Sequence, residues 1–170
     1  MRNLIRIITV FLFVGITATV SAQTPKFGHI DLQALIQLMP ERATAETEFL
    51  KFQGDLEDIF GEMQKDLQTK MTEFEALGTE ASEIKRNAKI AEIQDMQQRI
   101  QNYQQTAQAQ LNQKQTELLK PVFDKAEKTI EEVAKEKSLL YVFDIGSKVV
   151  LYKSNESLDV LPLVKTKLGI

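Results

Sequence analysis

The feature that most constrains this chain is a long segment rich in helix-forming residues and almost free of helix breakers. Between Pro40 and Ser138 it contains one proline and only three glycines. Most of the other residues are Ala, Glu, Gln, Lys, Leu and Met, which have high intrinsic helix propensities. The segment therefore predicts long helices rather than a mixed domain.

Apolar residues recur in the first part of this segment at steps of three and four, as on one face of a helix. They are Phe49, Phe52, Leu56, Ile59 or Phe60, Met63, Leu67, Met71, Phe74 and Leu77. Gly78 then predicts a helix stop, and the polar residues after it predict a new helix start. A second apolar series includes Ile84, Ala88, Ala91, Met96, Ile100 and Tyr103, and predicts a helix from about Glu80 to Lys137. We expect a helical hairpin arm over residues 41–137, with its tip near residue 78.

Pro121 lies inside the second predicted helix. A proline there removes one backbone hydrogen bond and clashes with the preceding turn. We therefore expect a kink just before Pro121 and a hinge at this residue.

Three short segments outside the arm are strand-like in residue type and length: Lys26–Asp31, Leu139–Asp144 and Val149–Lys153. Gly146-Ser147-Lys148 separates the last two and predicts an antiparallel hairpin turn. Leu158 to Leu168 predicts a short closing helix, with Pro162 in its first turn. The fold class expected is mostly α with a small β body, formed by residues 23–40 and 138–170, into which the antiparallel helical hairpin is inserted.

The N-terminus has the pattern of a secretory signal peptide over residues 1–22. Arg2 and Arg6 precede and flank an apolar run, and small residues end at Ala22. Cleavage after Ala22 would remove two of the 21 basic residues and none of the 24 acidic ones, which leaves a net charge of −5. We expect an exported, soluble protein that binds neither nucleic acid nor, by charge, an anionic membrane surface.

The small body predicts self-association. It has roughly the size below which a domain without disulfides or metal is rarely stable alone, and the chain has no cysteine. The segment Leu139–Phe143 is apolar on both faces, as expected for a strand that packs inside its subunit on one face and against a neighbour on the other. The residues assigned to this oligomerisation body are Phe27, Ile30, Leu140, Val142 and Val150.

The end segments resemble the Skp/OmpH family of periplasmic chaperones. Phe27-Gly28-His29-Ile30-Asp31-Leu32 looks like the opening strand and turn of that family. The segment from Glu136 to Asp144 is similar to its strand after the long helix, and Asp159 to Val164 to its closing helix. Ser138 stands where the family often has glycine, so a differently built turn is expected there.

The resemblance implies a homotrimer in the periplasm of a Gram-negative bacterium, whose arms hold unfolded outer-membrane β-barrel proteins without ATP. The residues expected to face such clients are Met63, Met71, Phe74, Leu77 and Met96, since flexible methionines suit adaptable surfaces. Packing between the two helices of the hairpin is the alternative role for each of these residues. The arm has 14 basic and 20 acidic residues, so the lipopolysaccharide contact proposed for basic members is not inferred here. No cofactor and no membrane contact are expected.

Two other classes of protein compete with this interpretation. An enzyme would need a cluster of catalytic or metal-ligating groups, but the single histidine, His29, has no cysteine partners. No catalytic and no metal-binding residues are therefore assigned. A structural coiled-coil protein, such as an envelope spacer or scaffold, would need a dense and regular apolar seam. Here ten glutamines between Gln94 and Gln115 thin that seam.

Overall fold

The computed structural model describes residues 26–170, so the expected signal peptide lies outside the described residues. The elements are β1 (Phe27–Ile30), α2 (Leu32–Leu38), α3 (Pro40–Ala76), α4 (Glu83–Glu136), β2 (Tyr141–Asp144), β3 (Leu158–Asp159) and α5 (Leu161–Leu168). The fold class is as predicted: mostly helical, with a small three-stranded sheet and a long helical hairpin.

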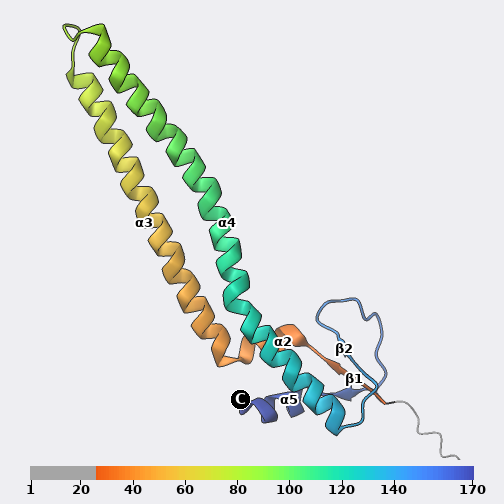
Figure 1. Ribbon diagram of the computed structural model, residues 1–170. Helices are drawn as coiled ribbons and strands as arrows, with labels where there is room; N and C mark the ends of the chain where they lie inside the picture. Colours follow the sequence, from red (N-terminus) through yellow and green to blue (C-terminus); the bar gives the residue numbers. More distant parts are fainter. Residues whose placement is uncertain (1–25) are drawn as a thin grey trace, which may run out of the picture.

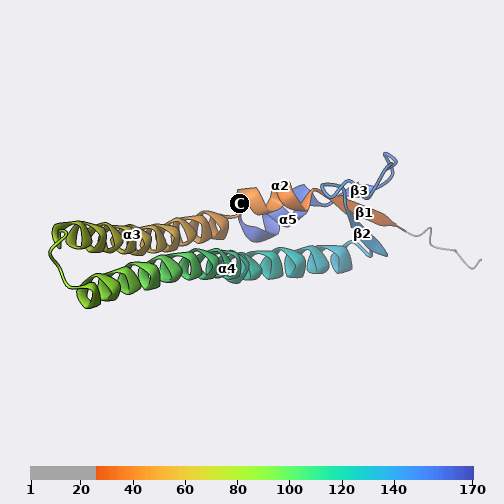
Figure 2. The ribbon, with the colours of Figure 1, turned by 90° about the horizontal axis from the view of Figure 1, so that it is seen from above.

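The two long helices lie side by side and run in opposite directions, away from a small body that holds the strands and the short helices (Figures 1 and 2). α4 has 54 residues, which corresponds to about 81 Å at 1.5 Å per residue. The chain reverses at Gly78, whose φ of 64° is left-handed. Glycine adopts this conformation without a steric penalty.

The sheet is parallel and has the order β2-β1-β3. The predicted antiparallel hairpin at Gly146-Ser147-Lys148 is wrong, and Val149–Lys153 is a loop rather than a strand. The N–H of Gly146 donates to the carboxylate of Asp144 at 2.9 Å, a local turn that directs the chain away from β2. A long loop then crosses to the other side of β1, where Leu158–Asp159 pairs instead.

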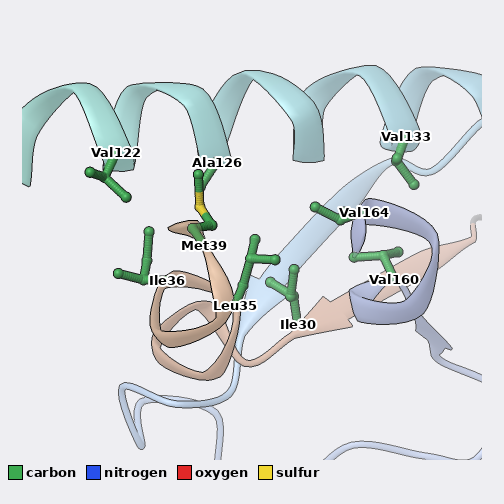
Figure 3. Packing of buried hydrophobic residues seen from close by; sticks show 9 residues of the cluster. All are labelled: Ile30, Leu35, Ile36, Met39, Val122, Ala126, Val133, Val160 and Val164. Carbon is green, nitrogen blue, oxygen red and sulfur yellow. The ribbon is translucent and has the colours of Figure 1, made fainter. Parts of the chain in front are cut away.

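The core of the body packs against the C-terminal part of α4, from Val122 to Val133 (Figure 3). Its buried residues come from β1, α2, α4 and α5 and from the short connections beside them: Ile30, Leu35, Ile36, Met39, Val122, Ala126, Val133, Val160 and Val164. Three of these residues belong to the helix that the sequence assigned wholly to the arm. α4 is therefore both one side of the arm and a wall of the body.

α4 ends in the same type of C-terminal turn that glycine commonly forms. The differently built turn expected at Ser138 is therefore wrong. The N–H of Ser138 donates to the carbonyl of Lys135 at 3.1 Å, and the N–H of Leu139 donates to that of Ala134 at 2.9 Å. This is the Schellman pattern, which needs a left-handed residue after the helix. Ser138 supplies it, with a φ of 52°.

Pro121 lies inside α4 and is exposed. The helix continues through it and bends where its lower part approaches the body (Figure 1). Val122, the next residue, is the first residue of α4 in the body core.

Candidate functional site

The middle of the arm has an apolar seam between its helices. Leu56 of α3 and Met96 of α4 are buried there. The hydroxyl of Tyr103 donates to the carbonyl of Leu56 at 3.0 Å and joins the two helices. These contacts stabilise the hairpin, while Leu50 and Ile59 of α3 are exposed in the same part of the arm.

The seam of the distal arm, toward the tip, combines half-buried apolar residues of α3 with ion pairs to α4. Lys70 and Glu73 of α3 face Lys89 and Glu92 of α4, with Nζ–Oε distances of 3.1 Å for Lys70–Glu92, 2.8 Å for Lys89–Glu73 and 3.1 Å for Lys89–Glu92. Hydrogen bonds from Lys70 and Lys89 hold the pKa of the Glu92 carboxyl below its usual value. Those to Glu73 and Glu92 raise the pKa of Lys89. Both shifts favour the charged forms near neutral pH.

Arg86 adds two further contacts between the helices at the tip. Its guanidinium donates to the carbonyl of Gly78 at 2.7 Å and lies 5.1 Å from the ring centroid of Phe74. Such a position over an aromatic face is attractive. Arg86, in the first turns of α4, therefore holds the tip turn in place.

Several apolar side chains of the distal arm are exposed to solvent. Ile84 is 83% exposed, and Met71 and Ile90 are each 39% exposed. Ala88 and Ala91, which the sequence placed on the inner face, are exposed as well. The inner face of α4 near the tip runs through Arg86, Lys89 and Glu92, so the predicted apolar series followed the wrong side of the helix there.

The five residues predicted to face clients do not share one environment. Met96 is buried in the seam, and Met63, Phe74 and Leu77 are half-buried between the helices. Only Met71 is exposed. Ile84 and Ile90 were not assigned to this set, and the apolar periodicity had placed Ile84 on the inner face of the hairpin.

The body has a second apolar surface, on the face of the sheet opposite the core. Phe27, Tyr141 and Phe143 form an aromatic cluster there, with ring centroids 6.0 to 6.4 Å apart, and all three are exposed. A cavity of about 1020 Å³ lies between this face and the loop after β2. His29 is buried beside it, and its Nδ1 is 2.9 Å from the Ser157 hydroxyl at the end of that loop.

The residues assigned to the oligomerisation body fall into two groups. Ile30 is buried in the core of its own subunit, and Val142 packs against that core. Phe27 and Leu140 are exposed, and Val150 is half-buried in the loop. The first pair therefore stabilises the subunit, and the outward-facing residues are the ones available to another molecule.

Among residues 26–170, no group of three His, Cys, Asp or Glu side chains is arranged to hold a metal ion. No helix in this part of the chain is long and apolar enough to cross a membrane.

Comparison with known protein families places this chain in one of them. Residues 26–168 match the family described as outer membrane protein, OmpH-like. An uncharacterized protein of Aquifex aeolicus (strain VF5) is 34% identical over 123 residues, which cover 71% of this chain and 74% of the relative. A crystal structure from Caulobacter crescentus CB15, provisionally described as an OmpH-like outer membrane chaperone, has a TM-score of 0.72. It is 13% identical and the match covers 85% of this chain and 84% of that chain, so this likeness is one of fold.

Proposed function

Because the chain belongs to the OmpH-like outer membrane protein family, we propose that it is an ATP-independent holdase chaperone of the periplasm. It binds unfolded outer-membrane β-barrel proteins between its coiled-coil arms and prevents their aggregation. No catalytic step is part of this function.

The observation that carries the proposal is the exchange of polar and apolar positions in the distal arm. Ion pairs take inner positions of α4 beside the half-buried apolar residues of α3 there, while Ile84, Ile90 and Met71 are exposed. Ion pairs of this exposure add little stability, so an apolar seam would serve a purely structural hairpin better. Dispersed apolar surface on a rigid arm suits an unfolded chain, whose apolar side chains are exposed and variable in sequence.

Assembly into a homotrimer is part of the same proposal. The aromatic cluster on the sheet is exposed in the single chain, and exposed apolar patches of this kind mark association sites. Bodies that pack through this face would leave the arms free to surround a client. One arm alone would offer only a narrow surface.

The direct test is an aggregation assay. An unfolded outer-membrane β-barrel protein is diluted out of urea without ATP, with and without the purified mature chain, and light scattering is followed. We expect the chain to suppress scattering at near-stoichiometric ratios. Undiminished scattering at a several-fold excess of the chain would refute the holdase function and favour a structural spacer or scaffold.

A pair of substitutions tests the surface that holds the client. Ile84→Asn together with Ile90→Asn removes exposed apolar groups without disturbing the seam, so the fold should be retained. Each apolar side chain contributes on the order of 1 kcal/mol when it is partly covered, so we expect the two substitutions together to lower client affinity roughly thirtyfold. Ala88→Asn, at an exposed position between them, is the matched control and should bind like the parent.

A further inference from the structure

The middle of α4 carries glutamines that neither the seam nor the body core uses. Ten of them lie between Gln94 and Gln115, where α4 runs beside α3 (Figure 1), and all ten are exposed. The half-buried line that faces α3 in this stretch runs through Ile100, Tyr103 and Ala107. The glutamines therefore belong to the surface of the arm, and their positions around the helix define the kind of surface.

Ion pairs identify one flank of the hairpin. The Nζ of Lys89 lies 2.8 Å from Glu73 of α3 and 3.1 Å from Glu92 of α4, so both glutamates lie on the same side of the seam. Residues separated by roughly whole numbers of turns, as at 7, 11, 18 or 25 positions, share one side of a helix. From Glu73 these steps lead back to four acidic residues: Asp66, Glu62, Asp55 and Glu48. From Glu92 they reach Arg99 and Glu117, so this side is the charged flank.

The opposite flank is uncharged along α4. Met71 and Ile90 each lie two positions before one of those glutamates, which is about 200° around a helix, so both lie on the other side of the seam. The same steps forward from Ile90 lead to a glutamine every time: Gln97, Gln101, Gln108 and Gln115. Gln104 lies among them. Within the described helix α4 this side has no charged residue between Ile90 and Leu119, and we refer to it as the amide flank.

An exposed flank without charge is unusual for this chain. Charged residues make up 26% of the sequence, and helix faces that meet only water normally carry them, as the charged flank does. At about 1.5 Å per residue, the amide flank extends roughly 44 Å. Glutamine keeps this surface polar without a net charge, so a molecule that covers it does not bury an unpaired charge, which is the costlier event.

We propose that the amide flank binds the backbone of an extended, unfolded polypeptide. The inference rests on the proposed function and names the part of the client that the arm recognises. A glutamine side chain carries N–H donors and a carbonyl acceptor like those of a peptide group. It therefore pairs with backbone N–H and C=O groups, which an unfolded chain exposes along its length whatever its sequence. Met71 and Ile90, each 39% exposed, add apolar contacts at the distal end of the same flank.

Two properties of the glutamine row fit this ligand. In the described chain, Gln108 is the one member of the row that forms a side-chain hydrogen bond, to Asn112 Oδ1 at 3.3 Å, so the other amides are available to another molecule. An extended chain rises about 3.3 Å per residue, so a flank of about 44 Å accommodates roughly 13 of its residues. Each hydrogen bond replaces one to water and contributes little by itself, which suits reversible holding.

Alanine substitutions on different sides of α4 test the inference, because alanine removes the amide and retains the helix. One variant carries four changes on the amide flank: Gln97→Ala, Gln101→Ala, Gln104→Ala and Gln108→Ala. The matched control carries four changes on the outer face and the charged flank: Gln98→Ala, Gln105→Ala, Gln110→Ala and Gln113→Ala. Each chain is titrated against a labelled outer-membrane β-barrel protein freshly diluted from urea. We expect the Kd to rise about tenfold for the first variant and less than about twofold for the control.

The possible results separate this inference from the proposed function. Equal affinities of the parent chain and the amide-flank variant, or equal losses in both variants, would overturn the inference and leave the holdase function intact. A parent chain that binds no client would refute the function itself, and the inference with it. Circular dichroism should show the helix content of the parent in both variants. If four changes reduce it, Gln101→Ala with Gln104→Ala is compared with Gln110→Ala with Gln113→Ala, and the expected loss is about threefold.

A second probe distinguishes recognition of the backbone from recognition of side chains. A soluble protein that has been reduced and carboxamidomethylated stays unfolded and has no β-barrel sequence. If the amide flank binds peptide groups, the parent chain should bind this probe, and the four changes on the flank should weaken that binding by a similar factor. A parent chain that does not bind the probe, or a variant with unchanged affinity for it, would show that the glutamines recognise features particular to outer-membrane proteins and would overturn the proposal.

Discussion

Ser138 is one of two non-glycine residues with a left-handed backbone in the described part of the chain, the other being Lys148. The left-handed φ of 52° at Ser138 closes α4 in the same pattern of hydrogen bonds that Gly169 closes after α5. A non-glycine residue in this conformation is strained by roughly 1–2 kcal/mol. Glycine relieves that strain but loses part of the gain through the entropy of the unfolded chain. We expect Ser138→Gly to raise the free energy of unfolding by about 1 kcal/mol.

The measurement is the urea midpoint at a fixed protein concentration, since association contributes to apparent stability. Ser82→Gly is the matched control, because Ser82 has an ordinary φ of −60° and glycine offers no relief there. An equal or lower midpoint for Ser138→Gly would show that this closure is not strained.

Asp144 links three segments of the body. Its Oδ1 accepts hydrogen bonds from the backbone N–H groups of Leu32 at 3.1 Å and Gly146 at 2.9 Å. Burial by itself raises the pKa of the Asp144 carboxyl, but backbone hydrogen bonds from Leu32, Gly146 and Ser147 outweigh it and hold the pKa below its usual value. The carboxylate therefore stabilises the fold above its unfolded pKa of about 4, and this contribution is lost as the pH falls through the lower folded value.

We expect Asp144→Asn to lower the free energy of unfolding by about 1–2 kcal/mol at pH 7, as for a hydrogen-bonded charged group. The difference from the parent chain should shrink below about pH 4, where the aspartate becomes protonated. Urea unfolding at pH 7, 5 and 3 measures it, with Asp58→Asn on the exposed face of α3 as the control. A difference that is constant with pH would exclude ionisation as its cause.

At the scale of the elements, α4 combines a short C-terminal part that is fixed in the body with a longer part that belongs to the arm. From Val122 onward its residues pack in the body core. Lys125 pairs with Glu41 at the start of α3, and Lys167 of α5 lies 3.2 Å from Glu132. Pro121 lies at the boundary between these two parts of α4. The backbone hydrogen bond that proline removes weakens the helix at this point.

We therefore predict that Pro121 acts as a hinge between the body and the arms. Pro121→Ala restores a backbone hydrogen bond and should narrow the spread of arm positions. Spin labels on Asn87→Cys near the tips would report distances between arms of one assembly. Lys120→Ala, at the neighbouring exposed position, is the control. An unchanged distance distribution after Pro121→Ala would contradict the hinge.

At the scale of the whole molecule, charge gives little help in attracting a client. The chain without residues 1–22 carries a net charge of −5, so long-range attraction to acidic clients should be weak. Apolar contacts from the arms depend on buried area and are not screened by salt. We expect client binding to persist when ionic strength rises from about 0.05 to 0.5 M, which shortens the Debye length to roughly 4 Å.

Titration of a labelled unfolded client at several salt concentrations tests this expectation. Apolar capture should be unchanged or slightly stronger at high salt. A steep loss of affinity over the same range would show that ion pairs hold the client.

The sequence by itself determined the mostly helical fold with two long helices and a small β body, because helix propensity and apolar periodicity act within a few residues of one another. It did not determine which side of α4 faces α3 near the tip. Ile84 and Ala88 have the spacing of an inner face, yet Arg86 and Lys89 lie inward because their partners on α3 are acidic or aromatic. Only the pairing of two helices decides such a choice.

The sheet shows the same limit. Val149–Lys153 has the residue types of a strand, but a strand exists only where another chain segment completes its hydrogen bonds. In the tertiary structure Leu158–Asp159 pairs with the second edge of β1. Val149–Lys153, whose residue types favour a strand more strongly, lies in a loop. The C-terminal part of α4 likewise joins the body core because α2 and α5 pack against it. These outcomes depend on contacts between residues distant in sequence, whose free energies local patterns do not contain.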